Sequence, residues 1–283
     1  MYAQVNGVKL FFDVEGSSLV ADGPTMKERP TVILVHGGPG GDHSVYKPDF
    51  GQLSDIAQIV YYDHRGNGRS DMSSSEHWTL DQWADDLKGL CDYLGIHKPI
   101  VVGASFGGFV AQAYAARHPG HAGKIALIST SAKVDFEQVY KAFGALGGPE
   151  VEAIARRYWD NPTDESRAEY RDRCVPFYSV KAQPNSDWLT RMIIRNDTAL
   201  WVNGPSHEQG RMDFRESLRT IECPVLVMCG DKDPIMPMAF SEVIASHVPE
   251  EQLSLHCISD CAHAIPADQP EQFFEILRRF ICK

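Results

Sequence analysis

The stretch at residues 100–108 constrains the fold of this chain more than any other. It reads Ile-Val-Val-Gly-Ala-Ser-Phe-Gly-Gly, an apolar run that ends in Gly-x-Ser-x-Gly and leads into a helix-forming segment with several alanines. This pattern predicts a sharp strand-to-helix turn that lifts the hydroxyl of Ser105 out of a sheet. The residues two before and two after such a strained serine need almost no side chain, and Gly103 and Gly107 meet that demand. Short Gly/Ser loops are common, so the interpretation depends on a base, an acid and an oxyanion hole elsewhere in the chain.

Strands and helices alternate on both sides of this turn. An Asn-Gly pair joins two alternating runs at residues 2–5 and 8–14, which predicts a hairpin, whereas the polar residues 17–30 predict a loop. The remaining patterns predict buried strands at 31–35 and 59–62, and further strands at 124–129, 224–229 and 253–257. They also predict helices at 80–94, 106–118, 238–247 and 269–281. This alternation of strands and helices predicts an α/β fold with a mostly parallel central sheet flanked by helices.

The alternation is interrupted between residues 131 and 216, where no buried strand is evident. Helical stretches are expected there at 136–146, 149–159 and 164–174, and again at 187–195 after the break at Pro184-Asn185. We therefore expect a core domain formed by residues 1–130 and 217–283, and a helical cap domain formed by residues 131–216 that sets specificity. Most aromatic side chains of the cap should form its own core, with one or two facing the site: Tyr158, Trp159, Phe177, Tyr178, Trp188 and Trp201.

A serine nucleophile needs a histidine base and a carboxylate that orients the imidazole. Asp233 follows the predicted strand at 224–229, and His263 follows the predicted strand at 253–257. Their order after the serine is the order expected when each residue lies on a loop after a strand. Asp231 is the rival carboxylate, and an Asx-turn before Pro234 is the plain structural alternative for Asp233.

The oxyanion hole needs two backbone N–H groups near the serine. We expect one donor to be the N–H of Phe106, directly after the serine, and the other to be the N–H of Gly38, in the loop after the strand at 31–35. His36, at the start of the same loop, precedes the serine in the chain, and we interpret it as a structural residue that braces loops.

The composition and charge of the chain argue against several classes of function. A net charge of −11 over 283 residues disfavours binding to nucleic acid, because contacts with phosphates need a basic surface. The seven cysteines show no CxxC pair, which favours reduced thiols and a cytoplasmic location. No run reaches the roughly 20 apolar residues of a membrane span, and the first residues do not resemble a signal peptide.

Together these residues resemble the α/β-hydrolase family. Within it, His-Gly-Gly-Pro-Gly-Gly at residues 36–41 and Asp-His-Arg-Gly-Asn-Gly-Arg-Ser at residues 63–70 look like the prolyl aminopeptidase (proline iminopeptidase) branch. The resemblance implies a serine hydrolase that releases an N-terminal proline or cleaves another small amide, and that uses no metal ion or organic cofactor. The expected partner is a small-molecule or short-peptide substrate.

The same resemblance implies that acidic side chains of the cap hold the free amine of the substrate. Gly-Pro-Ser-His-Glu at residues 204–208 is similar to a segment of that branch, and this makes Glu208 the candidate for the amine. A carboxylesterase or lactonase on the same core needs only an apolar pocket and stays open as an alternative. A ligand-binding protein without catalysis is a third possibility, because a fold alone does not specify an activity.

Overall fold

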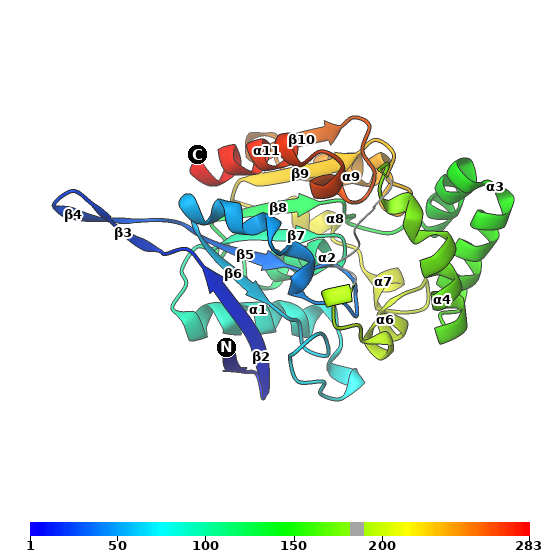
Figure 1. Cartoon of the computed structure of the whole chain (residues 1–283), viewed down its shortest axis with the longest axis horizontal. Coiled ribbons are helices and arrows are strands. Elements are labelled where there is room, and N and C mark those ends of the chain that lie inside the picture. The colour runs from blue at the N-terminus through cyan, green and yellow to red at the C-terminus, as the bar shows by residue number, and fades with distance from the viewer. Residues whose placement is uncertain (182–189) are drawn as a thin grey trace.

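The computed structural model describes residues 1–181 and 190–283, and an eight-stranded sheet runs through the middle of this part of the chain (Figure 1). Its strand order is β1-β2-β6-β5-β7-β8-β9-β10, and all neighbours from β6 to β10 are parallel, whereas β1 and β2 are antiparallel additions. The strands are β1 (Tyr2–Val5), β2 (Val8–Glu15), β5 (Thr31–Val35), β6 (Gln58–Tyr62), β7 (Ile100–Ala104), β8 (Lys124–Ile128), β9 (Val225–Gly230) and β10 (Leu253–Ile258).

The central strands are apolar throughout because both faces of the sheet are covered. In β5, Val32 and Leu34 belong to one hydrophobic cluster, whereas Ile33 and Val35 belong to the other, and all four side chains are buried. Successive side chains of a strand point to opposite faces, so a sheet covered on both sides needs an unbroken apolar run. The strands predicted at 31–35, 59–62, 124–129 and 224–229 are confirmed and largely buried. The strand predicted at 253–257 is also present as β10, but it lies at the edge of the sheet and is partly exposed.

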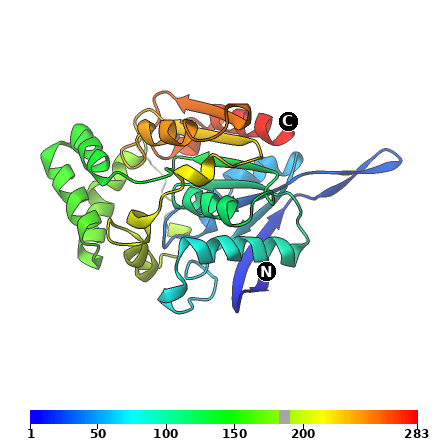
Figure 2. The ribbon, with the colours of Figure 1, turned by 180° about the vertical axis from the view of Figure 1, so that it is seen from behind.

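Helices form a layer on each face of the sheet (Figure 2). The face that carries Ile33 and Val35 packs against α1 (Leu80–Leu94), α2 (Phe106–Arg117) and α9 (Met238–Ala245). The opposite face packs against α11 (Pro270–Cys282), which buries Phe273 and Leu277 completely, and against the short helix η2 (Asp49–Asp55). Burial of each such side chain contributes roughly 1.5–3 kcal/mol relative to exposure, so α11 is held by its apolar face.

The prediction of a loop at residues 17–30 is wrong. Strands β3 (Leu19–Asp22) and β4 (Thr25–Glu28) pair antiparallel and project away from the body of the molecule (Figure 1). A two-residue turn at Gly23 and Pro24 joins them, and nearly all their side chains are exposed. A hairpin that buries neither face needs no alternation of apolar and polar residues, so hydrophobic periodicity did not reveal it.

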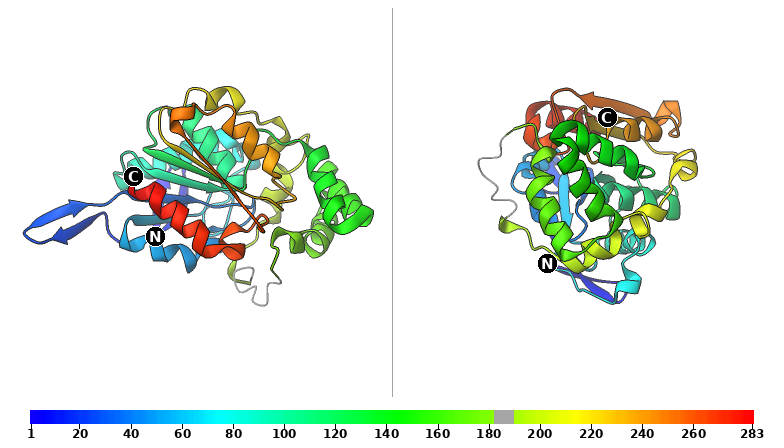
Figure 3. Two further views of the ribbon diagram at one scale, coloured as in Figure 1. Left: turned by 90° about the horizontal axis from the view of Figure 1, so that it is seen from above. Right: turned by 90° about the vertical axis from the view of Figure 1, so that its right-hand side faces the viewer.

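Only helices are found in the described residues between β8 and β9. They are α3 (Phe136–Asp160), α4 (Asp164–Arg173), η4 (Val175–Tyr178), α6 (Asn196–Val202), α7 (Glu208–Arg211) and α8 (Arg215–Leu218). The non-helical residue Gly148 divides α3 into two parts, as the separate predictions at 136–146 and 149–159 anticipated. Figure 3 (right) shows α3 and α4 in front of the sheet, on the side to which the parallel strands point. The division of the chain at residues 131 and 216 stays a prediction.

The helix predicted at 187–195 begins among residues 182–189, outside the described part of the chain, as does the break at Pro184-Asn185. Its described end is not helical at residues 192–195, and α6 begins only at Asn196. The reason is that backbone N–H groups of this segment donate to loops of the core: Ile193 to Asp42, and Arg195 to Gly40. None of the helices that the structure describes has the length and apolar character needed to cross a membrane.

Candidate active site

Ser105 lies in the turn between β7 and α2, at the carboxyl end of a strand in the middle of the sheet. Its backbone angles are φ 54° and ψ −120°, which residues other than glycine rarely adopt. Its N–H donates to Ile128 O at 2.9 Å, and its carbonyl accepts hydrogen bonds from Thr130 Oγ1 at 2.8 Å and from Gly108 N at 2.9 Å. These bonds hold the strained backbone of Ser105 in place. They involve only its N–H and carbonyl groups and not its hydroxyl group.

The two glycines around the serine are required by close packing. A Cβ atom at Gly103 would overlap the backbone of Gly107, and a Cβ atom at Gly107 would overlap the carbonyl oxygen of Val35 in β5. Backbone atoms do not move aside as the end of a flexible side chain does, so neither position tolerates a larger residue. The turn predicted from Gly-x-Ser-x-Gly is therefore present in the structure.

Asp233 and His263 are brought together from the loops after β9 and β10. His263 Nδ1 donates to Asp233 Oδ2 at 2.7 Å, and the Asp233 side chain is completely buried, whereas 12% of the His263 side chain is exposed. A carboxylate only accepts hydrogen bonds, so Nδ1 carries the proton, and Nε2 is an acceptor in the neutral ring. These two strands are parallel neighbours, which places their carboxyl ends side by side.

The structure distinguishes Asp233 from its rival Asp231. Asp231 is exposed, and its Oδ1 accepts a hydrogen bond from Cys261 N at 3.1 Å, which ties the two loops together. Asp233 also forms the Asx-turn that was considered as an alternative role for it. Its Oδ1 accepts hydrogen bonds from Ile235 N and Met236 N at 2.9 Å each. One carboxylate thus shapes its own loop with one oxygen and binds the imidazole with the other.

The His263 loop is packed close to the serine turn. Ser129, directly after β8, donates from Oγ to the His263 carbonyl at 3.0 Å, and its neighbour Ile128 accepts the hydrogen bond from Ser105 N. Among the described residues, no hydrogen bond joins Ser105 Oγ to His263. Bonds of this kind are often long before a substrate is bound, and they shorten in the reacting complex.

Tyr178 of η4 contacts the imidazole of His263. It belongs to the helical segment between β8 and β9, which we call the helical insert. Its ring meets the His263 ring edge to face at 4.9 Å between centroids, and its carbonyl accepts a hydrogen bond from Ala264 N at 2.8 Å. Its hydroxyl pairs with the Tyr170 hydroxyl at 2.8 Å, and burial raises the pKa of Tyr178, so the group stays neutral. Of the five described aromatic residues among the six singled out in the sequence, Tyr178 is the one that contacts the candidate base.

The other five aromatic residues have different positions. Tyr158 and Trp159 are buried in the core of the insert, where both rings pack near Tyr170. Trp201 is 44% exposed and meets the ring of Trp78 edge to face. Phe177 is half-buried at the edge of the hydrophobic cluster, and Trp188 lies outside the described residues.

The loop after β5 passes beside the serine. A Cβ atom on Gly37 would lie 3.4 Å from Ser105 Cβ, and the next residue, Gly38, has a φ of 130° that only glycine adopts freely. Phe106 is the first residue of α2, and the first N–H groups of a helix have no partner within it. Among the described residues, the N–H groups of Gly38 and Phe106 form no backbone hydrogen bond in a loop or turn. Their role as an oxyanion hole stays a prediction.

His36 and His64 join the loops after β5 and β6. His36 Nε2 accepts from the N–H of His64 at 3.2 Å, and His64 Nε2 donates to the carbonyl of His36 at 3.2 Å. Burial lowers the pKa of both imidazoles, and for His64 the neighbouring His36 lowers it further. Two neutral, completely buried rings at this place brace the loops, in agreement with the interpretation of His36.

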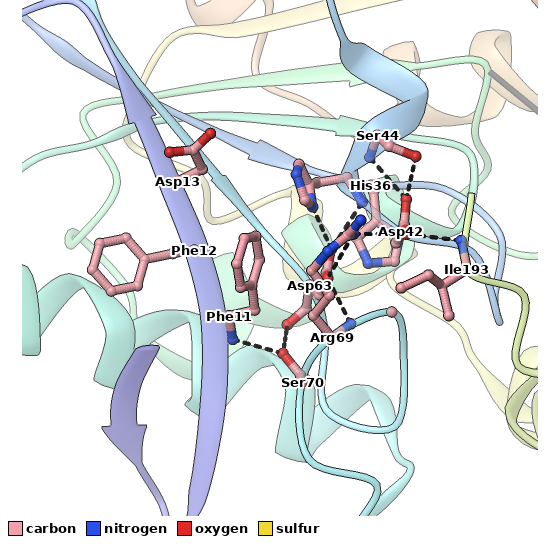
Figure 4. A network of polar contacts seen from close by, with 12 residues as sticks. Phe11, Phe12, Asp13, His36, Asp42, Ser44, Asp63, Arg69, Ser70 and Ile193 are labelled. Atoms are coloured by element: carbon pink, nitrogen blue, oxygen red, sulfur yellow. Dashed lines mark hydrogen bonds and ion pairs between the residues drawn. The ribbon is translucent and has the colours of Figure 1, made fainter. Parts of the chain in front are cut away.

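The carboxylate of Asp63 holds the same pair of loops by a second network (Figure 4). Its Oδ1 accepts from His43 Nδ1 at 2.6 Å and from His43 N at 2.9 Å, and its Oδ2 accepts from Arg69 N at 2.8 Å. Burial alone would raise the pKa of Asp63, but the His43 hydrogen bonds and the electrostatic attraction of His36 and His43 together lower it. Asp42, His43 and Asp63 have potential ligand atoms within 4.8 Å of one another, yet a cation would have to displace these donors.

Glu208, the candidate for the substrate amine, is bonded within the chain. Its Oε1 accepts a hydrogen bond from Leu80 N at the start of α1 at 2.8 Å, and its Oε2 pairs with Arg211 at 3.1 Å. The carboxylate therefore stabilises a helix N-terminus and is already neutralised by a guanidinium group. A substrate amine would have to share the carboxylate with these two partners.

A family model described as alpha/beta hydrolase fold matches residues 30–146, which include the serine turn. The chain has the α/β-hydrolase fold. The chain is 25% identical to the proline iminopeptidase PfmaB of Pestalotiopsis fici, over 100% of this chain and 99% of that protein. It is 26% identical to 3-oxoadipate enol-lactonase 1 of Acinetobacter baylyi, over 93% of this chain and 92% of that protein.

Among solved structures, the proline iminopeptidase of Mycobacterium smegmatis superposes on this chain with a TM-score of 0.77. The alignment covers 99% of this chain and 97% of that chain at 20% identity, which shows the shared fold. The predicted fold class is confirmed, and proline iminopeptidases are among the relatives, as the motifs implied.

Proposed function

We propose that this hydrolase cleaves its substrate through an acyl-enzyme on Ser105, with His263 as general base and acid and Asp233 as the group that orients the imidazole. The observation that carries the proposal is the 2.7 Å hydrogen bond from His263 Nδ1 to Asp233 Oδ2, on loops beside the serine turn. This bond leaves Nε2 as the acceptor that a serine proton requires.

The chemistry follows from these positions. Ser105 Oγ attacks the carbonyl carbon of the substrate while His263 Nε2 takes the hydroxyl proton, and the buried Asp233 stabilises the imidazolium that forms. The N–H groups of Gly38 and Phe106 hold the negative oxygen of the tetrahedral intermediate. The leaving group then takes the proton from His263. In the second half of the reaction, His263 takes a proton from a water molecule, which attacks the acyl-enzyme, and Ser105 leaves with the proton from His263.

For the substrate, we propose a small amide or the N-terminal residue of a short peptide. The support is the resemblance of residues 36–41 and 63–70 to the prolyl aminopeptidase branch, together with a relative named proline iminopeptidase that matches over nearly its full length. The proposed cap of residues 131–216 would select the substrate, and the contact of Tyr178 with His263 supports a location of this cap over the site.

A carboxylesterase or lactonase activity is the second candidate. Glu208 favours it, because this carboxylate already accepts a hydrogen bond from Leu80 N and pairs with Arg211. A relative named 3-oxoadipate enol-lactonase 1 matches most of the chain and supports the same candidate. An ester or lactone needs no anionic anchor, so an apolar pocket beside Ser105 would suffice.

The acyl-enzyme proposal is tested with a fluorophosphonate probe, which reacts with an activated serine. We expect stoichiometric labelling of the wild-type protein on the peptide that contains Ser105, and no labelling or turnover in Ser105→Ala. A fold check by circular dichroism accompanies both proteins. Labelling that persists in Ser105→Ala would contradict the assignment, and an unlabelled wild-type protein would favour a ligand-binding role.

The two substrate candidates are separated by three chromogenic compounds: a proline anilide, its N-acylated analogue and a simple aryl ester. A peptidase should lose the anilide reaction on acylation, whereas an esterase should turn over the ester alone. Glu208→Gln serves as the matched variant, because it removes the charge and keeps the shape. If Glu208 binds the amine, the KM for the anilide should rise at least about tenfold while the ester reaction stays unchanged.

A further inference from the structure

Residues 191–195 of the helical insert run along the loop after β5, which we name the oxyanion loop (residues 36–42). Arg195 N donates to Gly40 O at 2.7 Å, and Ile193 N donates to Asp42 Oδ2 at 2.9 Å. The Arg195 guanidinium extends the contact to Gly68 O at 3.1 Å, in the loop after β6. The insert is thus bonded to the oxyanion loop directly after Gly38.

The glycines of the oxyanion loop face two different partners. Gly37 lies against the serine turn, where its Cβ atom would be 3.4 Å from Ser105 Cβ. Gly40 lies against the insert, because a Cβ atom there would overlap the carbonyl oxygen of Arg195. The loop is therefore packed between the nucleophile on one side and the insert on the other, with Gly38 between the two contacts.

The carboxylate of Asp42 joins the oxyanion loop to the insert segment 191–195, as Figure 4 shows. Its side chain is completely buried, and its Oδ1 accepts a hydrogen bond from Ser44 N at 2.9 Å within its own loop. Its Oδ2 accepts from Ile193 N at 2.9 Å and from Arg69 at 3.1 Å. Loss of this charge would weaken the hydrogen bond of the part-buried Ile193 N–H group and the pairing with the Arg69 guanidinium.

We propose that the insert segment 191–195 positions the oxyanion loop for catalysis, and that Asp42 is the positioning residue through which it does so. The inference rests on the proposed function, in which Gly38 N binds the oxyanion. An oxyanion donor acts only when it lies about 2.7–3.1 Å from the developing charge, so a small displacement of the loop lowers the rate. The cap would then influence the chemical step as well as the choice of substrate.

The test compares Asp42→Asn with the wild-type protein on an activated aryl ester. The amide keeps one acceptor for Ser44 N but presents an NH₂ group to Ile193 N and Arg69. We expect kcat to fall about 10- to 100-fold with KM nearly unchanged, because only the transition state uses the oxyanion hole. A phenylboronic acid, whose adduct with Ser105 places an oxygen in the hole, should bind more weakly by a similar factor. The carboxylic acid product should bind as before.

Gly40→Ala perturbs the same contact from the other side and serves if Asp42→Asn does not fold. Gly7→Ala is its matched control, because Gly7 has a φ of 81° against 82° for Gly40 and no atom within 4 Å of an added Cβ. Gly40→Ala should show the same loss in kcat, and Gly7→Ala should not. Wild-type kcat in a folded Asp42→Asn or Gly40→Ala protein would overturn the positioning role and leave the acyl-enzyme proposal intact. If the wild-type protein shows neither turnover nor fluorophosphonate labelling, the proposed function is rejected, and this inference is rejected with it.

Discussion

Replacement of Asp233 by asparagine tests the proposed triad most directly. In Asp233→Asn, the amide oxygen can still accept from Ile235 N and Met236 N, as Oδ1 does now at 2.9 Å each. The NH₂ group then faces His263 Nδ1, where the carboxylate accepts a hydrogen bond at 2.7 Å. Two donors do not pair, so the imidazole should move its proton to Nε2 and lose the acceptor that the serine needs.

The magnitude follows from this change of tautomer and from the lost charge beside the imidazolium. Such a replacement in a serine triad lowers kcat by about 10⁴, which corresponds to about 5.4 kcal/mol in activation free energy. The fold should be little affected, because both turn hydrogen bonds remain. Asp233→Ala removes those bonds as well, and should cost a further ~2 kcal/mol in the free energy of unfolding.

The assay measures kcat and KM on an aryl ester, together with thermal unfolding of each variant. Asp231→Asn is the matched control: it is two residues away, exposed, and bonded to Cys261 N instead of to the imidazole. We expect its kcat to stay close to the wild-type value. Substantial turnover in folded Asp233→Asn, or an equal loss in Asp231→Asn, would refute the assignment of the carboxylate.

Three further outcomes are expected. Gly107→Ala should lower the free energy of unfolding by at least ~3 kcal/mol, measured by urea denaturation, because its Cβ overlaps the Val35 carbonyl. Below pH 6.5 the unfolded chain protonates His36 and His64 while the buried rings stay neutral, so stability should fall as the pH falls, by up to ~1.4 kcal/mol per pH unit for each histidine. His64→Gln should reduce that slope between pH 7.5 and 5, and an unchanged slope would contradict the argument. Tyr178→Phe keeps the ring against the base and should retain kcat, whereas Tyr178→Ala should lower it in steady-state kinetics.

Much of the core could be predicted because its signals are local. Strands buried on both faces need unbroken apolar runs, and helices need an apolar stripe, so both leave a pattern in the sequence. Parallel strands bring their carboxyl ends to one edge of the sheet, so the order Ser105, Asp233, His263 is informative in the sequence alone. The hairpin β3–β4 escaped detection because it buries no face and therefore carries no periodicity.

The sequence by itself determined the class of fold, the serine turn and the candidate residues for its chemistry, since these depend on local backbone demands and on strand order. Only the tertiary structure shows that Asp233 contacts the His263 imidazole, whereas Asp231, two residues earlier, contacts Cys261 N. The same holds for Glu208, bonded to the start of α1, and for Tyr178 against His263. These contacts join segments far apart in the chain, and their geometry is set by packing that no local pattern records.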